Sequence, residues 1–272
     1  PEGLAQGDRR EPGGRPRRIH AKITGMDASH DSRPFDLIVF GATGFTGRLV
    51  AEYLHARYAG SDLRWAMAGR SAGKLADVRD ALGLPADTPL PVADAADPQA
   101  LAQLVAQTRV VLTTVGPYQL YGEPLIRACA AAGTDYVDLC GEPLWMAKMI
   151  PELDAPAKGS GARIVFSCGF DSIPFDLGVY HAQQEAQQRF GAPLARVHGR
   201  VKTMKGTFSG GTVASMLASM QAIGRDRGLV RTMLNPFALV PGFKGPRQPN
   251  DHVAEHDDLA QAWTAPFVMA PI

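Results

Sequence analysis

Three glycines with the spacing of a dinucleotide-binding loop lie in the segment GATGFTG, residues 41–47. This segment follows the apolar stretch Asp36–Phe40 and precedes an amphipathic stretch of helical length. In such a loop, glycines allow a tight turn, close approach of the backbone to a pyrophosphate and close packing of helix on strand. We therefore expect Gly41, Gly44 and Gly47 to bind the phosphates of a nucleotide. The alternative, a glycine-rich structural turn, must account for all three glycines without a ligand.

The second β-rich stretch distinguishes the two nicotinamide cofactors. NAD-binding domains carry an acidic residue about 20 residues past the glycines, where it holds the ribose 2′-hydroxyl. Here the stretch ends in AMAGRS, residues 66–71, without an acid. Arg70 can bind a 2′-phosphate through two hydrogen bonds, Ser71 can donate to it, and Lys74 lies one helical turn further on. The pattern favours NADP, the alternative being that Arg70 and Lys74 form a solvated helix start.

Two other segments follow predicted strands and complete the expected cofactor site. Asp94 comes after the third predicted strand and is expected near the adenine, although an acidic cap for the helix beginning at Asp97 explains it equally well. Gly116 and Pro117 follow the fourth strand, at the carboxyl edge where open α/β sheets bind ligands. We expect them beside the nicotinamide, with a simple Gly-Pro turn as the alternative.

The elements that position these residues alternate along the chain from residue 35 onward. Short β-rich apolar runs alternate with amphipathic stretches of helical length, which is typical of a parallel sheet with crossover helices. The pattern predicts an α/β fold built on a Rossmann-type, doubly wound parallel sheet. The expected strands are Asp36–Phe40, Arg64–Ala68, Pro89–Val92, Val110–Val115, Tyr136–Leu139 and Arg163–Ser167, and the expected helices cover residues 45–58, 71–83, 97–107, 122–132, 143–158 and 174–189.

We divide the chain into three parts. Residues 1–33 are rich in Gly, Pro and Arg and lack apolar periodicity, so they are expected to form a disordered tail. Residues 34–190 are expected to form the NADP-binding Rossmann domain. Residues 191–272 are expected to form part of a second, α+β substrate domain.

The sequence pattern changes where the expected substrate domain begins. A polar-alternating stretch, Arg196–Lys205, predicts a strand, and the glycine-rich turn SGGT, residues 209–212, opens a predicted helix that runs to about Arg225. The sequence ends in the apolar run FVMAPI without a turn or capping signal. We expect the substrate domain to be truncated there.

Composition argues against several classes of protein. Lys plus Arg, 28 residues, nearly balance Asp plus Glu, 27 residues, so no overall field attracts nucleic acid. Cys129, Cys140 and Cys168 are too few and too scattered for a disulfide framework, and neither they nor the histidines have metal-site spacing. No apolar run is long enough to span a bilayer. We expect no metal and no nucleic-acid partner, and a cytoplasmic protein for which peripheral membrane contact and oligomeric state stay open.

Five motifs together carry a family resemblance: GATGFTG, AGRS, TTVGPYQLYG, YVDLCGE and SCGFDSIPFDLG. Over about residues 35–270 the chain resembles the saccharopine dehydrogenase-like oxidoreductases, in the branch that includes mycobacterial trans-acting enoyl reductases. The resemblance implies an NADP-binding Rossmann domain followed by a domain that closes over the substrate. It also implies a role for each of these residues: Gly41, Thr43, Gly44, Phe45, Thr46 and Gly47 in the phosphate loop, Arg70 and Ser71 at the 2′-phosphate, and Gly116 and Pro117 beside the nicotinamide.

Catalytic residues are less well marked than cofactor residues. None of the six tyrosines has Lys four residues later, so the Tyr-x-x-x-Lys pair of short-chain dehydrogenases is absent. Hydride transfer needs little protein chemistry beyond positioning and one hydrogen-bond donor for the product. Tyr118 and Tyr121, just past the expected nicotinamide floor, are the best-placed donors. The alternative is that these tyrosines only pack their rings.

Three functions remain open at this point, two of them enzymatic and one not. The first, implied by the resemblance, is NADPH-dependent reduction of an activated double bond, such as the enoyl group of a lipid or polyketide intermediate; its substrate is a small or lipid-linked molecule. The second is a saccharopine-type amino-acid dehydrogenase, for which Arg200, Lys202 and Lys205 could bind substrate carboxylates unless they form a solvated face. The third is a non-catalytic NADP-binding scaffold.

Overall fold

The computed structural model describes residues 32–206, 208–248 and 253–267. A disordered tail was expected over residues 1–33, and residues 1–31 of it lie outside the described residues.

Five parallel strands form the central sheet. They are β1 (Phe35–Phe40), β2 (Trp65–Ala68), β3 (Thr108–Thr113), β4 (Asp135–Val137) and β5 (Ile164–Val165), in the spatial order β2-β1-β3-β4-β5. Because β1 has β2 on one side and β3 on the other, the direction of winding reverses at β1. Such a switch point leaves a crevice outside the carboxyl ends of the strands, where open α/β folds bind ligands.

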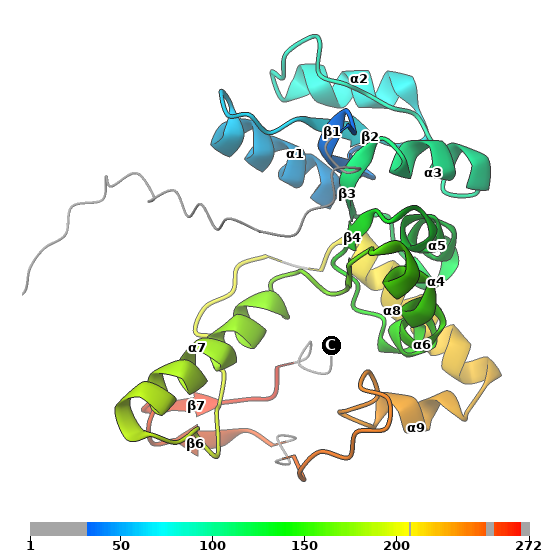
Figure 1. Ribbon diagram of the computed structural model, residues 1–272. Helices are drawn as coiled ribbons and strands as arrows, with labels where there is room; N and C mark the ends of the chain where they lie inside the picture. The colour runs from blue at the N-terminus through cyan, green and yellow to red at the C-terminus, as the bar shows by residue number, and fades with distance from the viewer. Residues whose placement is uncertain (1–31, 207, 249–252, 268–272) are drawn as a thin grey trace, which may run out of the picture. The chain divides into compact units, whose positions relative to one another are not determined.

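Helices cover both faces of this sheet (Figure 1). Ile38 and Phe40 of β1 point into a core formed with α3 (Pro98–Val105), α5 (Glu123–Ala132) and α6 (Pro143–Ser160). Val39, between them, points into a second core formed with α1 (Phe45–Tyr58) and α2 (Ala72–Ala81). Successive side chains of a strand face opposite ways, so a strand buried on both faces reads as a continuous apolar run. The predicted α/β fold with a Rossmann-type sheet is confirmed.

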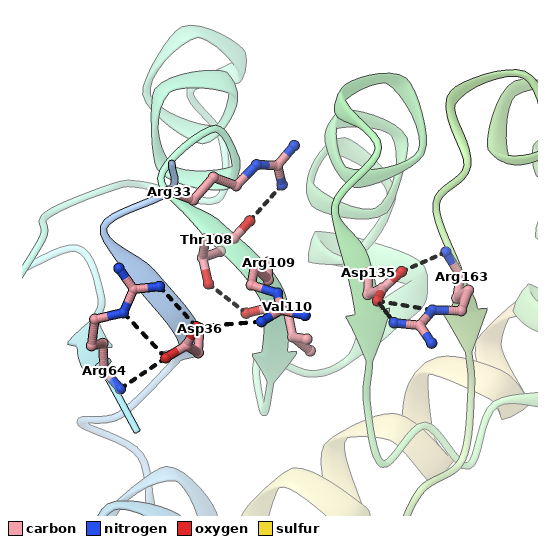
Figure 2. Close-up of polar contacts among 8 residues, drawn as sticks. All are labelled: Arg33, Asp36, Arg64, Thr108, Arg109, Val110, Asp135 and Arg163. Atoms are coloured by element: carbon pink, nitrogen blue, oxygen red, sulfur yellow. Dashed lines mark hydrogen bonds and ion pairs between the residues drawn. The ribbon is translucent and has the colours of Figure 1, made fainter. Parts of the chain in front are cut away.

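Ion pairs tie the amino ends of the strands together, at the edge opposite the ligand crevice (Figure 2). Asp36 at the start of β1 pairs with Arg64 at 2.9 Å and with Arg109 of β3 at 3.7 Å. Asp135 of β4 pairs with Arg163, whose backbone N–H also donates to that carboxylate at 2.8 Å. These contacts link neighbouring chain segments at one edge and leave the carboxyl edge to loops.

The third predicted strand, Pro89–Val92, is wrong as a full strand. Val92 makes only an isolated parallel bridge with Gly69, while the N–H of Met67 donates to the carbonyl of Pro89 at 3.1 Å. Proline has no N–H to donate, and Pro89 and Pro91 leave this segment too few donors for a ladder. The segment therefore runs along the outer edge of β2 without forming a strand.

The six predicted helices are all present, with ends within two residues of those expected. The short helix α4 (Tyr118–Tyr121), ahead of α5, was not predicted, and α7 (Ile173–Phe190) is the last helix before Gly191.

Residues after Gly191 combine helices with a small antiparallel ribbon. Helix α8 (Gly210–Arg225) begins at the cap Ser209, whose hydroxyl accepts from the N–H of Thr212 at 3.2 Å, as the SGGT turn predicted. The short helix α9 (Leu229–Met233) and the paired strands β6 (Glu255–Asp257) and β7 (Ala262–Thr264) follow.

The strand predicted over Arg196–Lys205 is wrong: this segment has no regular secondary structure and is almost entirely exposed. Alternating polarity describes a strand only where another strand supplies the hydrogen bonds, and no described residue does so here. The boundary expected near residue 190 stays a prediction. Among the described helices, none combines the length and apolar character needed to cross a bilayer.

Candidate active site

The loop between β1 and α1 uses its glycines for different reasons. Gly41 has a φ of +92°, and a side chain there would lie 2.7 Å from Val115 and 2.8 Å from Thr114. A Cβ on Gly47 would collide with the carbonyl oxygen of Gly41 and lie 2.8 Å from the Cα of Ala42. The fold itself therefore requires these two glycines.

Gly44 is the glycine that the fold does not explain. Its φ of −79° suits any residue, and a Cβ would meet its nearest neighbour at an ordinary 3.4 Å. Gly44 is exposed and is the N-cap of α1, which has neither a side-chain cap nor an acidic residue in its first turn. An uncapped helix N-terminus with room for close backbone approach suits a phosphate. The helix start at Gly44 therefore has room for a pyrophosphate, whose binding there stays a prediction.

The other loop residues lie around this helix start. Phe45 is 72% exposed at the first position of α1. Thr43 is half-buried, and its methyl group lies 3.9 Å from the position a Cβ would take on Gly69 at the end of β2. Thr46 is half-buried and lines an apolar groove with Leu49 and other side chains of α1, β1 and β3. The contacts of these three residues leave their expected roles in the phosphate loop untested.

The loop after β2 brings a cation and a hydroxyl to the same edge of the sheet. Phe40 and Ala68, the last residues of β1 and β2, are register partners, so the two loops emerge side by side. Arg70 is exposed and makes no ion pair or hydrogen bond with another described residue. Ser71 caps α2, where its hydroxyl oxygen accepts from the N–H of Lys74 at 3.4 Å and its own hydrogen stays available. Lys74 is exposed in the first turn of α2.

Asp94 closes a turn ahead of α3. Its carboxylate accepts from the N–H of Ala96 at 2.9 Å, and its backbone carbonyl accepts from Asp97 at 3.1 Å. The helix cap is Asp97 itself, which accepts from the N–H groups of Gln99 and Ala100. The side chain of Asp94 is exposed, and its expected contact with an adenine stays a prediction.

Gly116 and Pro117 follow β3 and lead into α4, at the same edge as the phosphate loop. The N–H of Thr114 donates to the carbonyl of Phe40 at 3.0 Å, so the loops after β1 and β3 are in direct contact. This placement is the one expected for a surface beside the nicotinamide, although no contact in the structure tests that role.

The structure separates the two tyrosines expected to act as donors. Tyr118 is 5% exposed, its ring stacks on Trp145, and its hydroxyl donates to the carbonyl of Thr113 at 3.2 Å and accepts from the N–H of Leu139 at 3.4 Å. Burial, together with the nearby charge of Asp138, raises the pKa of Tyr118. This environment corresponds to the alternative in which the tyrosine packs its ring.

Tyr121 is 50% exposed at the end of α4. Its hydroxyl is therefore the more accessible donor of the two. A catalytic role for either residue stays a prediction.

Two buried carboxylates at this edge were missed by the sequence reasoning. Asp138 is 2% exposed and Glu142 is 1% exposed. Asp138 accepts from the N–H groups of Cys140 at 3.0 Å and Ser167 at 2.8 Å, and from the hydroxyl of Tyr136 at 2.8 Å. Burial raises the pKa of Asp138 to about 6 despite these hydrogen bonds. An acid placed directly after a buried strand was the signal that could have revealed Asp138, whereas Glu142 lies further along, just before α6, and has no such signal.

Comparison with known proteins gives the domain its family. Residues 37–165 match the saccharopine dehydrogenase NADP binding domain. A protein of Mycobacterium tuberculosis, provisionally named a trans-acting enoyl reductase, is 46% identical over 248 residues, which cover 88% of this chain and 59% of the relative. A trans-acting enoyl reductase of Mycobacterium ulcerans is 40% identical over 254 residues, which cover 89% of this chain and 60% of the relative. The chain thus spans about three fifths of the length of the curated relatives it matches.

A solved structure of saccharopine dehydrogenase from Saccharomyces cerevisiae aligns with a TM-score of 0.43 and 17% identity, over 54% of this chain and 32% of that one. This remote likeness adds nothing about function. The sequence matches confirm the predicted family resemblance and the predicted cofactor. The stretch 37–165 of this chain is a saccharopine dehydrogenase NADP binding domain.

Proposed function

We propose that this chain is an NADPH-dependent oxidoreductase that reduces the activated double bond of an enoyl thioester carried on a small or lipid-linked molecule. The observation that carries the proposal is its 40–46% identity, over 88–89% of its length, to proteins named trans-acting enoyl reductase. The presence of an NADP binding domain supports it, because such a reduction needs a hydride donor.

The residues present fit the cofactor, and Gly44 is the residue that best supports this fit. The fold does not require a glycine at position 44, and the N-terminus of α1 that begins there is uncapped, so both features suit a pyrophosphate. The other residues of the loop would surround it: Gly41, Thr43, Phe45, Thr46 and Gly47. The cofactor, when bound, supplies the hydride.

At the other end of the cofactor, Arg70, Ser71 and Lys74 would bind the 2′-phosphate and Asp94 would lie near the adenine. Arg70 is open and has no partner among the described residues, so its guanidinium can form a charge-assisted fork. Gly116 and Pro117 would lie beside the nicotinamide.

The acceptor chemistry follows from which proton donors the site offers. Reduction of a ketone develops alkoxide charge and benefits from a matched acid, whereas conjugate reduction can place charge on a thioester oxygen held by hydrogen-bond donors. The chain has no Tyr-x-x-x-Lys pair, and the hydroxyl of Tyr118 is already used inside the fold. Tyr121 is the exposed hydroxyl nearest in sequence to the nicotinamide loop and is our candidate donor.

One observation weighs against the saccharopine-type alternative. Arg200 is paired with Asp257 at 2.7 Å, and the segment that carries Lys202 and Lys205 is exposed and irregular. These three cations therefore form no preassembled site for substrate carboxylates.

Cys129, Cys140 and Cys168 are all free thiols, and we infer a reducing, cytoplasmic location from them.

The proposal is tested by following the absorbance of NADPH with three sets of acceptors: enoyl thioesters, simple ketones and aldehydes, and 2-oxo acids supplied with amines. We expect oxidation with enoyl thioesters and little with ketones. Turnover confined to the 2-oxo acid and amine pair would assign the chain to the saccharopine type. Tight NADPH binding without turnover on any acceptor would indicate a scaffold.

A further inference from the structure

Glu142 is a buried carboxylate to which the cofactor site gives no role. Its Oε1 accepts from the N–H of Tyr118 at 2.7 Å, and its Oε2 accepts from the N–H of Gln119 at 2.8 Å. These N–H groups open α4, directly after Gly116 and Pro117. Glu142 thus fixes the loop that follows β3.

A third donor reaches Glu142 from a distant part of the chain. The hydroxyl of Ser215, in α8, donates to Oε1 at 2.7 Å across 73 residues of sequence. One helical turn further on, the hydroxyl of Ser219 accepts from the side-chain amide of Gln119 at 3.2 Å. Two serines spaced four apart therefore connect one face of α8 to the loop after β3.

The rest of α8 supplies little packing to hold it in place. No residue of this 16-residue helix is buried. Apart from the half-buried Ile223, its large apolar residues are exposed and fall on the side turned away from the two serines, at the helical spacing i, i+3, i+4 and i+7. These are Val213, Met216, Leu217 and Met220, exposed by 39%, 50%, 52% and 58%. The position of α8 at this edge consequently depends on the polar contacts.

Ser215 also lies close to the surface expected beside the nicotinamide. A Cβ built on Gly116 would be 3.7 Å from the Ser215 hydroxyl oxygen. We propose that Glu142 is a positioning residue that, through Ser215, holds α8 against the Gly116–Pro117 loop and makes this helix a wall of the nicotinamide end of the site. The inference rests on the proposed function for the place of the nicotinamide.

Hydrogen exchange of α8 measures this link without any need for turnover. Two ligands separate the ends of the cofactor: NADPH, and 2′-phospho-ADP-ribose, which lacks the nicotinamide. We expect NADPH to slow amide exchange in residues 210–225 and 2′-phospho-ADP-ribose to leave it unchanged, while both slow exchange in the phosphate loop.

Ser215→Ala removes the link but keeps the two bonds from Glu142 to α4. Hydrogen bonds to charged groups are among the stronger ones, so exchange of α8 in the cofactor-free protein should rise by roughly tenfold or more. The variant should also lose the protection that NADPH gives to α8, while its dissociation constant for NADPH stays close to that of the wild type. Ser215→Thr, which keeps the hydroxyl, should restore both properties.

A matched control separates the link from the stability of the helix itself. Ser209→Ala removes the cap of α8 and should speed exchange in the first turn only, with NADPH protection of the remaining helix intact. With an enoyl thioester as substrate, Ser215→Ala should lower kcat and leave the KM for NADPH unchanged.

The inference is overturned if Ser215→Ala leaves exchange of α8 unchanged, or if NADPH and 2′-phospho-ADP-ribose affect α8 alike. Failure of the proposed function has a different signature. In that case enoyl thioesters are not reduced, while NADPH still protects α8 in a manner that depends on Ser215.

Discussion

Replacing Asp138 by Asn should change how the stability of this protein depends on pH. Asp138 is 2% exposed, and burial raises its pKa from 3.8 to about 6. The carbonyl oxygen of the asparagine can accept from Cys140 and Ser167, and its amide can donate to the hydroxyl oxygen of Tyr136, whose own proton then loses its acceptor. The substitution therefore removes the titration at a cost in stability that does not vary with pH.

The sign follows from which state binds the proton more tightly. Because the folded-state pKa is raised, the folded protein holds this proton up to about pH 6, whereas the unfolded chain releases it near pH 4. The wild type loses the associated stability as pH rises through this window. A change in pKa from 3.8 to about 6 corresponds to about 3 kcal/mol.

Urea unfolding of both proteins at intervals from pH 4 to pH 7.5 measures the effect. The free energy of unfolding of Asp138→Asn minus that of the wild type should rise by about 2–3 kcal/mol over this range, mostly between pH 4 and pH 6. Asp94→Asn is the matched control, since Asp94 makes the same bond to an N–H two residues on, at the surface. A difference between Asp138→Asn and the wild type that does not vary with pH would refute the reasoning.

Three other predictions concern the cofactor and donor residues. Arg70→Ala should weaken NADPH binding by roughly tenfold to a hundredfold and leave NADH binding unchanged; calorimetric titration giving wild-type affinity for NADPH would remove Arg70 from the site. Gly44→Ala should fold normally but bind NADPH weakly, whereas Gly47→Ala should lose about 1–3 kcal/mol of stability by overpacking; thermal unfolding and titration of both variants distinguish the two roles. Tyr118→Phe should cost about 1–3 kcal/mol of stability but keep turnover, because its hydroxyl satisfies a buried carbonyl, while Tyr121→Phe should lower kcat; the opposite result would make Tyr118 the donor.

The sequence by itself determined the elements of the NADP binding domain and the choice of cofactor. A strand, a glycine loop and a helix follow one another within residues 35–58, and the period of the apolar residues identifies each element. The feature that favours NADP, Arg70 and Ser71 in place of an acid, likewise lies in one short stretch. Such features are local, because each glycine or cation acts within the loop that carries it.

The two strand predictions that proved wrong also have physical reasons. Pro89 and Pro91 supply no N–H groups, so an apolar run that looks like a third strand forms only a bridge with Gly69. Arg196–Lys205 alternates in polarity but finds no partner strand. A periodic pattern reports which side chains could be buried together, whereas a strand also needs a donor and an acceptor on a neighbour.

Only the tertiary structure decided which polar groups meet at the carboxyl edge. Tyr118 is buried, and Glu142 accepts a hydrogen bond from the hydroxyl of Ser215, 73 residues away in the sequence. Nothing in the residues around either partner indicates the other. A buried carboxylate must find donors wherever the fold brings them, so its partners are set by the packing of distant segments and not by the sequence around it.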